Sequence, residues 1–413
     1  MSAASRRTGT ALIRRGHWLT LPDCKQVLVV AHTMTYAQRL REVCALLESD
    51  LRIQVAFTIA PHVFGDGVSR LLQDLRTAVL PWEEAVRTEF DLALAAGSRG
   101  IEQVRAPLVR LSHGAGHIKL LRETESPEAA DPIRPPGMLS RRYLVRDGRV
   151  VPAAIALGHE QDREQLAQSC PEALPVAAVV GDPCYDRIAA SLPHRAEYRR
   201  ALGLGDRQGL VVVASTWGRS SSFGHFDALL PRLLSELPRD GYRTALLVHP
   251  NVWAGHSSWQ MQAWLAALRR RGVAVVPPEA DWQTLLIAAD WVIGDHGSVT
   301  SYATLAGAPI LLARSPDREV HPASPAAALA LTAPALSPLH PLEEQLRYAA
   351  AEYRSEEHAR VAGLISSEPG RFHRNMRALL YRLLRLGQPA YLPAAGQLPA
   401  PPPLSSWTGE AVA

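Results

Sequence analysis

Short apolar runs alternate with longer segments of helical spacing along most of this chain. In the first half, the apolar runs have the length and the Val, Ile and Leu content of buried strands, and the segments between them repeat apolar positions as helices do. The expected strands span residues 27–31, 53–59, 90–95, 108–111 and 176–180, with helices over 36–48 and 68–75. Strand and helix in this rhythm favour right-handed crossovers and a parallel sheet.

The same alternation restarts after residue 205, following Arg-rich helical segments at about 193–202. The strands expected there span residues 210–214, 244–248, 273–276, 291–293 and 310–313, and the helices between them span 226–236, 259–270 and 282–289. Two successive Rossmann-like halves place a cleft between two domains, with ligands at the carboxyl ends of the strands. The sequence therefore predicts an α/β protein.

The pattern also predicts where these domains begin and end. We expect a basic leader over residues 1–20, domains over 21–192 and 193–386, and a proline-rich tail over 387–413 that is extended and poorly ordered. A segment rich in proline and acidic residues, 123–136, is expected to be a loop or lid.

Composition and charge narrow the class of partner. Hydrophobic residues make up 47% of the 413 residues, as in ordinary globular proteins. The net charge of +4 suits an anionic small ligand or a membrane surface, and no basic stripe with interleaved aromatics indicates nucleic acid. The arginine-rich leader could contact an anionic bilayer, although a solvated tail is the simpler interpretation. No run of about 20 apolar residues predicts a membrane span.

The four cysteines are widely spaced and form no CxxC pair. A zinc site or a disulfide framework is therefore not expected, and a reducing cytoplasm is the predicted location. No dense carboxylate cluster calls for a metal, and no cofactor is expected.

The first candidate site follows the strand at 108–111. That strand delivers His113 to its carboxyl end, where the imidazole could act as a general base. Gly114 and Gly116 allow a ligand to approach the backbone closely, and Lys119 could offset phosphate charge. The alternative is a glycine turn with a hydrogen-bonded structural histidine.

The second candidate site follows the strand at 291–293. Asp295, Gly297, Ser298 and Thr300 lie in a polar turn that enters a predicted helix at 300–305. Free N–H groups at a helix N-terminus, with two hydroxyls beside them, could hold a phosphate. The alternative is plain N-capping by Asp295 or Ser298.

Two further residues follow strands of the second half. His249 ends the run at 244–248, and the proline after it directs the chain out of the sheet. We expect His249 to face His113 across the cleft, although a lone histidine is more often structural. Arg219 follows the strand at 210–214 and could pair with a phosphate, or be solvated.

Together these pieces resemble the CDP-glycerol glycerophosphotransferase family, which primes and polymerises teichoic acids. The family's motifs are matched, in order over roughly residues 108–312, by His113-Gly114 with Lys119, by Gly181-Asp-Pro183-Cys-Tyr-Asp186, by Ser215-Thr216-Trp217-Gly-Arg219, by His249-Pro250, and by Asp281, Leu285-Leu286, Ala289-Asp290 and Gly294-Asp295-His296-Gly297-Ser298-Val299. Three places depart from the family pattern. Ala115-Gly116 stands for Thr-Pro, Ser215 for proline, and His296-Gly297 for Tyr-Ser.

The resemblance implies a GT-B fold, with two Rossmann-like domains facing a central cleft. It also implies transfer of glycerol phosphate, or a related polyol phosphate, from a CDP-linked donor to an acceptor hydroxyl, including a lipid-linked one at the inner membrane face. In this scheme His113 is the base, and His249 stabilises or protonates the diphosphate. Gly114, Lys119, Arg219, Asp295, Gly297, Ser298 and Thr300 form the donor-phosphate site.

Two other functions fit the same residues. One is a GT-B enzyme acting on a UDP-sugar, either a glycosyltransferase or a relative of the UDP-N-acetylglucosamine 2-epimerases. The other is a non-catalytic protein that binds nucleotides or partners. The nucleobase pocket separates the first from a CDP-dependent enzyme, and the sequence does not reveal it.

Overall fold

The computed structural model describes residues 21, 23–65, 67–120, 137–315 and 318–409. The expected leader at 1–20 and the whole of the expected loop at 123–136 lie outside these residues. The chain forms two compact units, which we describe separately. Unit 1 consists of Met1–His113, Ser126–Pro183 and Gly370–Ala394, and unit 2 of Gly114–Glu125, Cys184–Pro369 and Ala395–Ala413.

Unit 1 is built on a seven-stranded parallel sheet with the order β3-β2-β1-β4-β5-β8-β9. Its strands are β1 (Lys25–Ala31), β2 (Ile53–Ile59), β3 (Val79–Leu80), β4 (Leu92–Ala95), β5 (Leu108–Leu111), β8 (Ala154–Leu157) and β9 (Ala177–Val179). Successive side chains of β1 pack on opposite faces: Val27 and Val29 join one hydrophobic cluster, and Leu28 and Val30 join another. Both faces are buried, as in parallel sheets generally, which explains the uninterrupted apolar runs.

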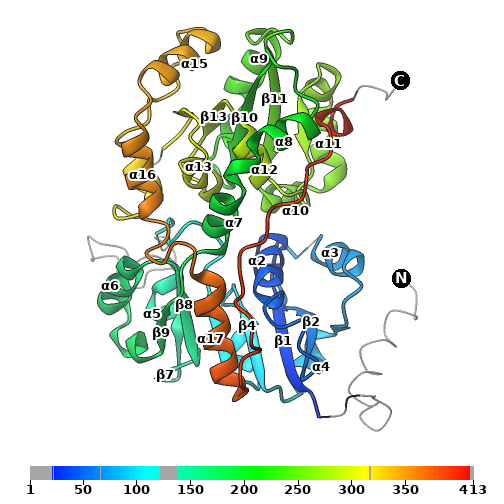
Figure 1. The fold of residues 1–413 in the computed structure, drawn as a ribbon, viewed down its shortest axis with the longest axis vertical. Coiled ribbons are helices and arrows are strands. Elements are labelled where there is room, and N and C mark those ends of the chain that lie inside the picture. The colour runs from blue at the N-terminus through cyan, green and yellow to red at the C-terminus, as the bar shows by residue number, and fades with distance from the viewer. Residues whose placement is uncertain (1–20, 22, 66, 121–136, 316–317, 410–413) are drawn as a thin grey trace. The chain divides into compact units, whose positions relative to one another are not determined.

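Helices cover both faces of this sheet (Figure 1). The helices and short elements of unit 1 are α2 (Met34–Cys44), α3 (Val68–Asp74), α4 (Trp82–Ala85), η2 (Ile101–Gln103), η4 (Gly137–Leu139), α5 (Arg141–Leu144), the hairpin β6 (Val145–Arg146) and β7 (Arg149–Val150), α6 (Glu160–Ser169), η5 (Pro171–Val176) and α17 (Phe372–Leu384).

Unit 2 repeats the plan with five parallel strands in the order β12-β11-β10-β13-β14. They are β10 (Gly209–Ser215), β11 (Tyr242–Val248), β12 (Ala274–Val276), β13 (Trp291–Gly294) and β14 (Ile310–Leu312). Val211 and Val213 pack on one face, against α9 (Phe226–Ser235) and α11 (Ser258–Arg270), whereas Leu210 and Val212 pack on the other. In both units the strand order reverses beside the first strand, the switch point at which open α/β sheets bind ligands.

The remaining elements complete unit 2. They are α7 (Pro183–Ser191), η6 (Leu192–His194), α8 (Arg195–Ala201), η7 (Phe223–His225), α9 (Phe226–Ser235), α10 (Pro250–His256), α11 (Ser258–Arg270), α12 (Gln283–Ala288), α13 (Ser298–Ala303), α14 (Pro325–Ala330), α15 (Leu342–Ala351), α16 (Ser355–Gly363) and η8 (Leu404–Trp407). In the described part of the chain, no helix is both long and apolar enough to cross a membrane.

The predicted α/β class is confirmed, and every strand expected from an apolar run is present. The division of the chain differs from the expected boundaries at 192/193 and 386/387. The chain leaves unit 1 at Pro183, because the side chains of Ile188 and Tyr198 already pack in the core of unit 2. It returns to unit 1 at Gly370, because α17 buries Met376 and Leu380 against that unit's sheet.

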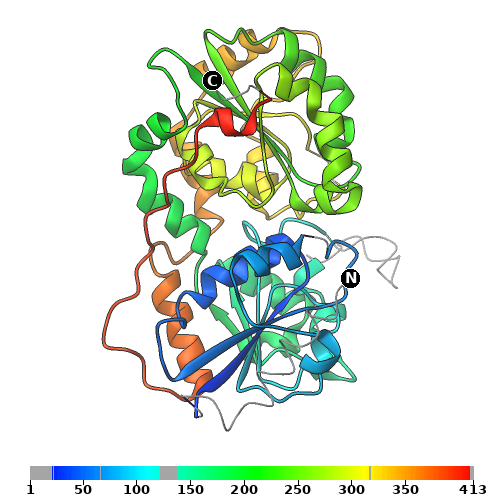
Figure 2. The same cartoon turned by 90° about the vertical axis from the view of Figure 1, so that its right-hand side faces the viewer.

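The proline-rich tail is largely without helix or strand over residues 387–403, as an extended segment is, but it is not poorly ordered as its composition predicts. Leu398, Leu404 and Trp407 are buried in the core of unit 2. The backbone is held as well, since Tyr198 Oη donates to Leu398 O at 2.9 Å and Leu398 N donates to Ser191 Oγ at 3.0 Å. Figure 2 shows the later part of this segment, drawn red, lying along unit 2. Three buried apolar side chains thus make this later part of the tail belong to unit 2.

Candidate functional site

Asp295 lies at the switch point of unit 2, directly after β13, and is 1% exposed. Its carboxylate accepts hydrogen bonds from Thr216 N at 3.0 and 3.1 Å, from Ser222 N at 2.9 Å and from Gly297 N at 3.0 Å. One buried anion therefore joins the loop after β10 to the turn after β13. Because its oxygens are occupied by N–H donors, Asp295 shapes the site by holding these loops.

The turn after Asp295 leads into α13, which spans six residues. Its N-cap is Gly297, and no side chain caps it, so the alternative of N-capping by Asp295 or Ser298 is wrong. Ser298 is partly exposed at the start of the helix. Thr300 is 1% exposed and turns inward, where a Cβ atom on Gly294 would lie only 2.3 Å from its Oγ1.

The glycine segment after His113 belongs to unit 2 rather than to the first domain. Ile118 O accepts from His321 N at 2.7 Å, and Leu120 N donates to Glu319 O at 3.0 Å. At the start of the segment, a Cβ atom on Gly114 would lie 2.2 Å from Ser298 Oγ. Only glycine allows this approach, so Gly114 and Ser298 are in direct contact.

Lys119, from the segment after Gly114, contacts the loop that follows β10 through its side chain. Its Nζ donates to Trp217 O at 3.2 Å and lies 4.3 Å from the centre of the Trp217 ring. Arg219 is in the same loop and is exposed. Two cationic side chains therefore gather beside the end of β10, as an anionic ligand would require.

His249 directly follows β11 and is partly buried. Its Nδ1 accepts a hydrogen bond from Asn251 N at 3.0 Å and so caps α10. Since Nδ1 is the acceptor, the neutral ring carries its hydrogen on Nε2. His249 thus has a structural role at the helix start, and its other nitrogen is a hydrogen-bond donor.

His113 follows β5 in unit 1, as expected, and its ring centre lies 4.5 Å from that of Tyr36. Because His113 and His249 belong to separately described units, their facing each other stays a prediction.

Sequence reasoning missed a polar group at the same end of the unit 1 strands. His32 follows β1 and is fully buried; its Nε2 donates to Arg99 O at 2.7 Å. Burial, with smaller contributions from His62 and Arg110, lowers the pKa of His32 to about 4. Arg110 in β5 is 2% exposed and donates to Tyr143 O at 2.8 Å, and burial lowers its pKa to about 10. The rule that found His113, a polar residue directly after an apolar strand, would also have found His32.

Two residues were missed in unit 2. His296 follows Asp295 and is 2% exposed. Burial lowers its pKa, with a smaller lowering by Lys119. Arg314 lies two residues after β14 and contacts His225 at 3.0 Å. The sequence signal that could have identified His296 is that it replaces tyrosine within a motif that otherwise matches the family.

The Gly181-Asp-Pro183 motif lies where the chain leaves unit 1. Asp182 pairs with Arg39 at 3.2 Å, and both side chains are buried. This motif therefore anchors the end of unit 1 on α2.

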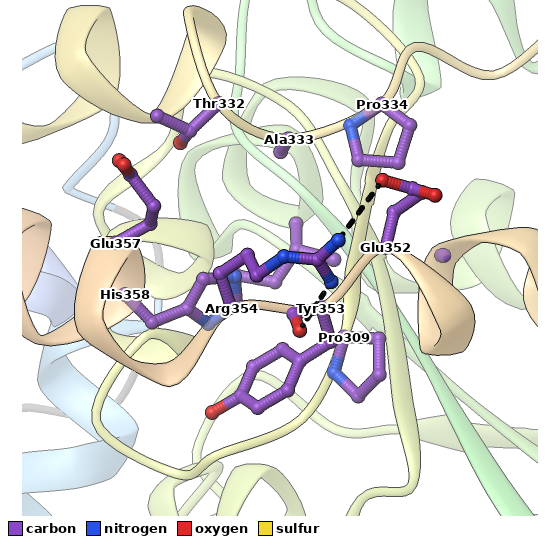
Figure 3. Close-up of a pocket in the computed structure, with 11 residues that line it drawn as sticks. Pro309, Thr332, Ala333, Pro334, Glu352, Tyr353, Arg354, Glu357 and His358 are labelled. Atoms are coloured by element: carbon purple, nitrogen blue, oxygen red, sulfur yellow. Dashed lines mark hydrogen bonds and ion pairs between the residues drawn. The ribbon is translucent and has the colours of Figure 1, made fainter.

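A pocket in unit 2 lies away from these residues, near the start of β14 (Figure 3). Tyr353, Arg354 and His358 line it, and Arg354 pairs with Glu352 at 3.5 Å. Parallel strands put this pocket at the opposite edge of the sheet from Asp295 and His249. Among the described residues, no group of three or more His, Cys, Asp or Glu side chains could hold a metal ion.

No protein-family model and no curated protein sequence matches the chain. Solved structures do resemble it. The wall teichoic acid polymerase TagF, in a variant soaked with CDP-glycerol, matches with a TM-score of 0.60 and 13% identity over 93% of this chain and 99% of that one. A second TagF structure matches with a TM-score of 0.58 and 13% identity over 92% and 97%. A Listeria monocytogenes protein described as a UDP-N-acetylglucosamine 2-epimerase matches with a TM-score of 0.56 and 14% identity over 90% and 100%.

These likenesses establish the fold. The chain has the GT-B fold, and the predicted structural resemblance to a teichoic acid polymerase is confirmed at that level. The neighbours named here are enzymes.

Proposed function

We propose that this protein transfers a glycerol phosphate, or a related polyol phosphate, from a CDP-linked donor to an acceptor hydroxyl. The observation that carries the proposal is the set of residues at one edge of the unit 2 sheet. Lys119, Arg219, His249 and Ser298 all lie at or beside the carboxyl ends of parallel strands, where α/β proteins bind nucleotides. The fold shared with TagF supports the choice of donor.

The charges at this edge suit a diphosphate. Lys119 and Arg219 supply positive charge, and the buried carboxylate of Asp295 is already satisfied by backbone N–H groups. A dianionic ligand would therefore meet cations and hydroxyls rather than an unpaired carboxylate. We assign the Ser298 hydroxyl to a phosphate oxygen, and Thr300 to shaping the turn, since its side chain is buried against Gly294.

In the proposed reaction, an acceptor hydroxyl oxygen attacks the β-phosphorus of the donor. A new phosphorus–oxygen bond forms, the bond from that phosphorus to the bridging oxygen breaks, and CMP leaves with the electron pair. His113 takes the hydroxyl proton. His249 donates from Nε2 to the diphosphate, because its Nδ1 accepts from Asn251 N. Such a transfer depends mainly on positioning and on neutralising the developing charge.

The second candidate is an enzyme acting on a UDP-sugar. The fold shared with the epimerase-like protein favours it to a similar degree. The two candidates differ in the nucleobase that the protein selects.

Titration calorimetry with CDP-glycerol, CMP, UDP-N-acetylglucosamine and UDP tests the proposal. We expect the cytidine ligands to bind selectively, and Ser298→Ala to weaken their binding by about tenfold, the contribution of one hydrogen bond to a charged group. At His249, asparagine is a better test than alanine. Asparagine is also a good N-cap and keeps α10 capped, so His249→Asn removes the imidazole without removing the cap. His113→Ala should lower turnover by at least about 100-fold without loss of donor binding.

Selective binding of the uridine ligands would replace the proposal with the second candidate. If none of the four ligands binds, or if His113→Ala transfers at the wild-type rate, the protein is not this transferase.

A further inference from the structure

The imidazole of His296 is enclosed by protein, yet it makes no hydrogen bond with the residues that the structure describes. The side chain is 2% exposed, and neither Nδ1 nor Nε2 has a hydrogen-bond partner among those residues. Leaving a buried donor or acceptor unpaired costs stability, and most such groups in folded proteins are paired with protein, water or ligand. A polar ring in this position therefore indicates a group that the protein does not itself supply.

The backbone on both sides of the ring is fixed. The Asp295 carboxylate accepts from Thr216 N and Ser222 N, and Gly297 N donates back to the same carboxylate at 3.0 Å. His296 lies between these two anchored residues. The backbone that carries the ring is therefore held in place by the same carboxylate that joins the ends of β10 and β13.

The charged groups that act on His296 come from three segments. Lys119 contributes positive charge from the segment after Gly114. Asp295 contributes negative charge, but its oxygens are occupied by N–H donors. Glu319 also contributes negative charge; it is exposed and accepts from Ser220 Oγ at 2.7 Å. Both carboxylates thus accept hydrogen bonds from other groups. Lys119, whose Nζ donates to Trp217 O, keeps its positive charge beside the imidazole, and the two groups could share an anion.

We propose that His296 is a ligand of the donor diphosphate and takes up a proton when the diphosphate binds. This inference rests on the proposed binding of a nucleotide-diphosphate donor in unit 2. It assigns a new role to a position at which the chain departs from the family motif. The substrate class that it predicts is any nucleoside diphosphate ester, whichever base it carries.

The direction of proton transfer follows from the surroundings of the ring. In the free protein, burial lowers the pKa of His296, and the ring is neutral near pH 7. A diphosphate oxygen beside the ring would favour the charged form and raise the pKa. Binding should therefore tighten as the pH falls towards 6, and protons should be taken up from the buffer.

The proton count can be measured by titration calorimetry of the full chain at pH 7. CDP-glycerol, UDP and inorganic pyrophosphate are each titrated in two buffers that differ in ionisation enthalpy. We expect net proton uptake when CDP-glycerol binds; UDP and pyrophosphate titrate near pH 7 themselves, so for these two the uptake by His296 is the difference between wild type and the His296 variants. In His296→Gln and His296→Asn, affinity should fall by about tenfold or more, and the uptake should vanish. Both variants keep a hydrogen-bonding side-chain amide but cannot take up a proton near pH 7.

His358 provides a matched control. It is also buried in unit 2, with an Nδ1 that has no hydrogen-bond partner in the described part of the chain and a pKa lowered by burial, but it lines the pocket near the start of β14. His358→Gln should leave both affinity and proton uptake unchanged. Loss of uptake in this variant would overturn the assignment to His296.

The outcomes separate this inference from the proposed function. Binding of CDP-glycerol without proton uptake, or with uptake that persists in both His296 variants, would overturn the role of His296 and leave the transferase standing. If UDP alone binds, with proton uptake that depends on His296, the role of His296 stands and the CDP-dependent transferase is overturned. If either variant fails to fold, the wild-type proton count and the NMR titration of the His296 Cε1–H with and without pyrophosphate decide the question.

Discussion

In each unit, one buried side chain links the ends of the two central strands of the sheet, but the two side chains have opposite hydrogen-bonding roles. In unit 1, the residue after β1 is His32, whose Nε2 donates to Arg99 O beyond the end of β4. In unit 2, the residue after β13 is Asp295, whose carboxylate accepts from Thr216 N beyond the end of β10. A neutral hydrogen-bond donor thus joins the central strands of one sheet, and an anionic acceptor joins those of the other.

This difference determines what each edge can offer a ligand. The carboxylate of Asp295 gathers backbone N–H groups and holds two loops in fixed positions, beside which Lys119 and Ser298 lie. The edge of unit 1 instead carries histidine and a buried arginine, Arg110, whose hydrogen bonds go to Tyr143 O, Ser98 Oγ and Met138 Sδ. Unit 2 is therefore the more rigidly preorganised edge, which is the property that a diphosphate site needs.

Removal of the Asp295 carboxylate should have the largest effect. Asp295→Ala leaves three buried backbone N–H groups without their acceptor, at about 1–3 kcal/mol each, so we expect the free energy of unfolding of unit 2 to fall by about 3–5 kcal/mol. Urea denaturation, with hydrogen exchange of the unit 2 amides, measures this loss. Asp295→Asn keeps one acceptor and should lose less.

Glu279→Ala removes an exposed carboxylate from the same unit and serves as the control. A loss of less than about 1 kcal/mol in Asp295→Ala, comparable to a surface change, would mean that the carboxylate does not organise this edge.

The second-largest expected effect is the pH dependence that His32 gives to the stability of unit 1. His32 has a pKa of about 4 when folded and 6.5 when unfolded, so the unfolded state binds more protons between these values. Stability from this group is therefore lost as the pH falls from 6.5 to 4, by about 3 kcal/mol at the acidic end. Asp162 acts in the opposite direction, because burial raises its pKa to about 6.

The two contributions can be separated by mutation. His32→Asn should flatten the acid loss, whereas Asp162→Asn should steepen it, as measured by urea midpoints for unit 1 between pH 4 and 7. Identical slopes in wild type and His32→Asn would show that the His32 imidazole is not held neutral by burial.

Much of this comparison could be predicted from the sequence, because apolar runs define strands and strand ends define sites. His113, His249 and Ser298 were placed correctly at strand ends by that rule. The partners of Asp295 could not be predicted, since Thr216 and Ser222 are more than 70 residues away in the chain. Nor could composition reveal that the proline-rich tail buries apolar side chains in unit 2, because proline content reports local stiffness and not distant contacts.

The smallest predicted effect concerns the contact between Gly114 and Ser298, which tests how closely the edge of unit 2 is packed. In Gly114→Ala, the new Cβ atom would lie 2.2 Å from Ser298 Oγ, so the hydroxyl must rotate away. We expect donor affinity, measured by calorimetry, to fall by about tenfold, the same loss as in Ser298→Ala. Because both changes remove one hydroxyl contact, the double variant should bind no more weakly than either single one. Additive losses would mean that Gly114 contributes to donor binding by a route other than the position of the serine.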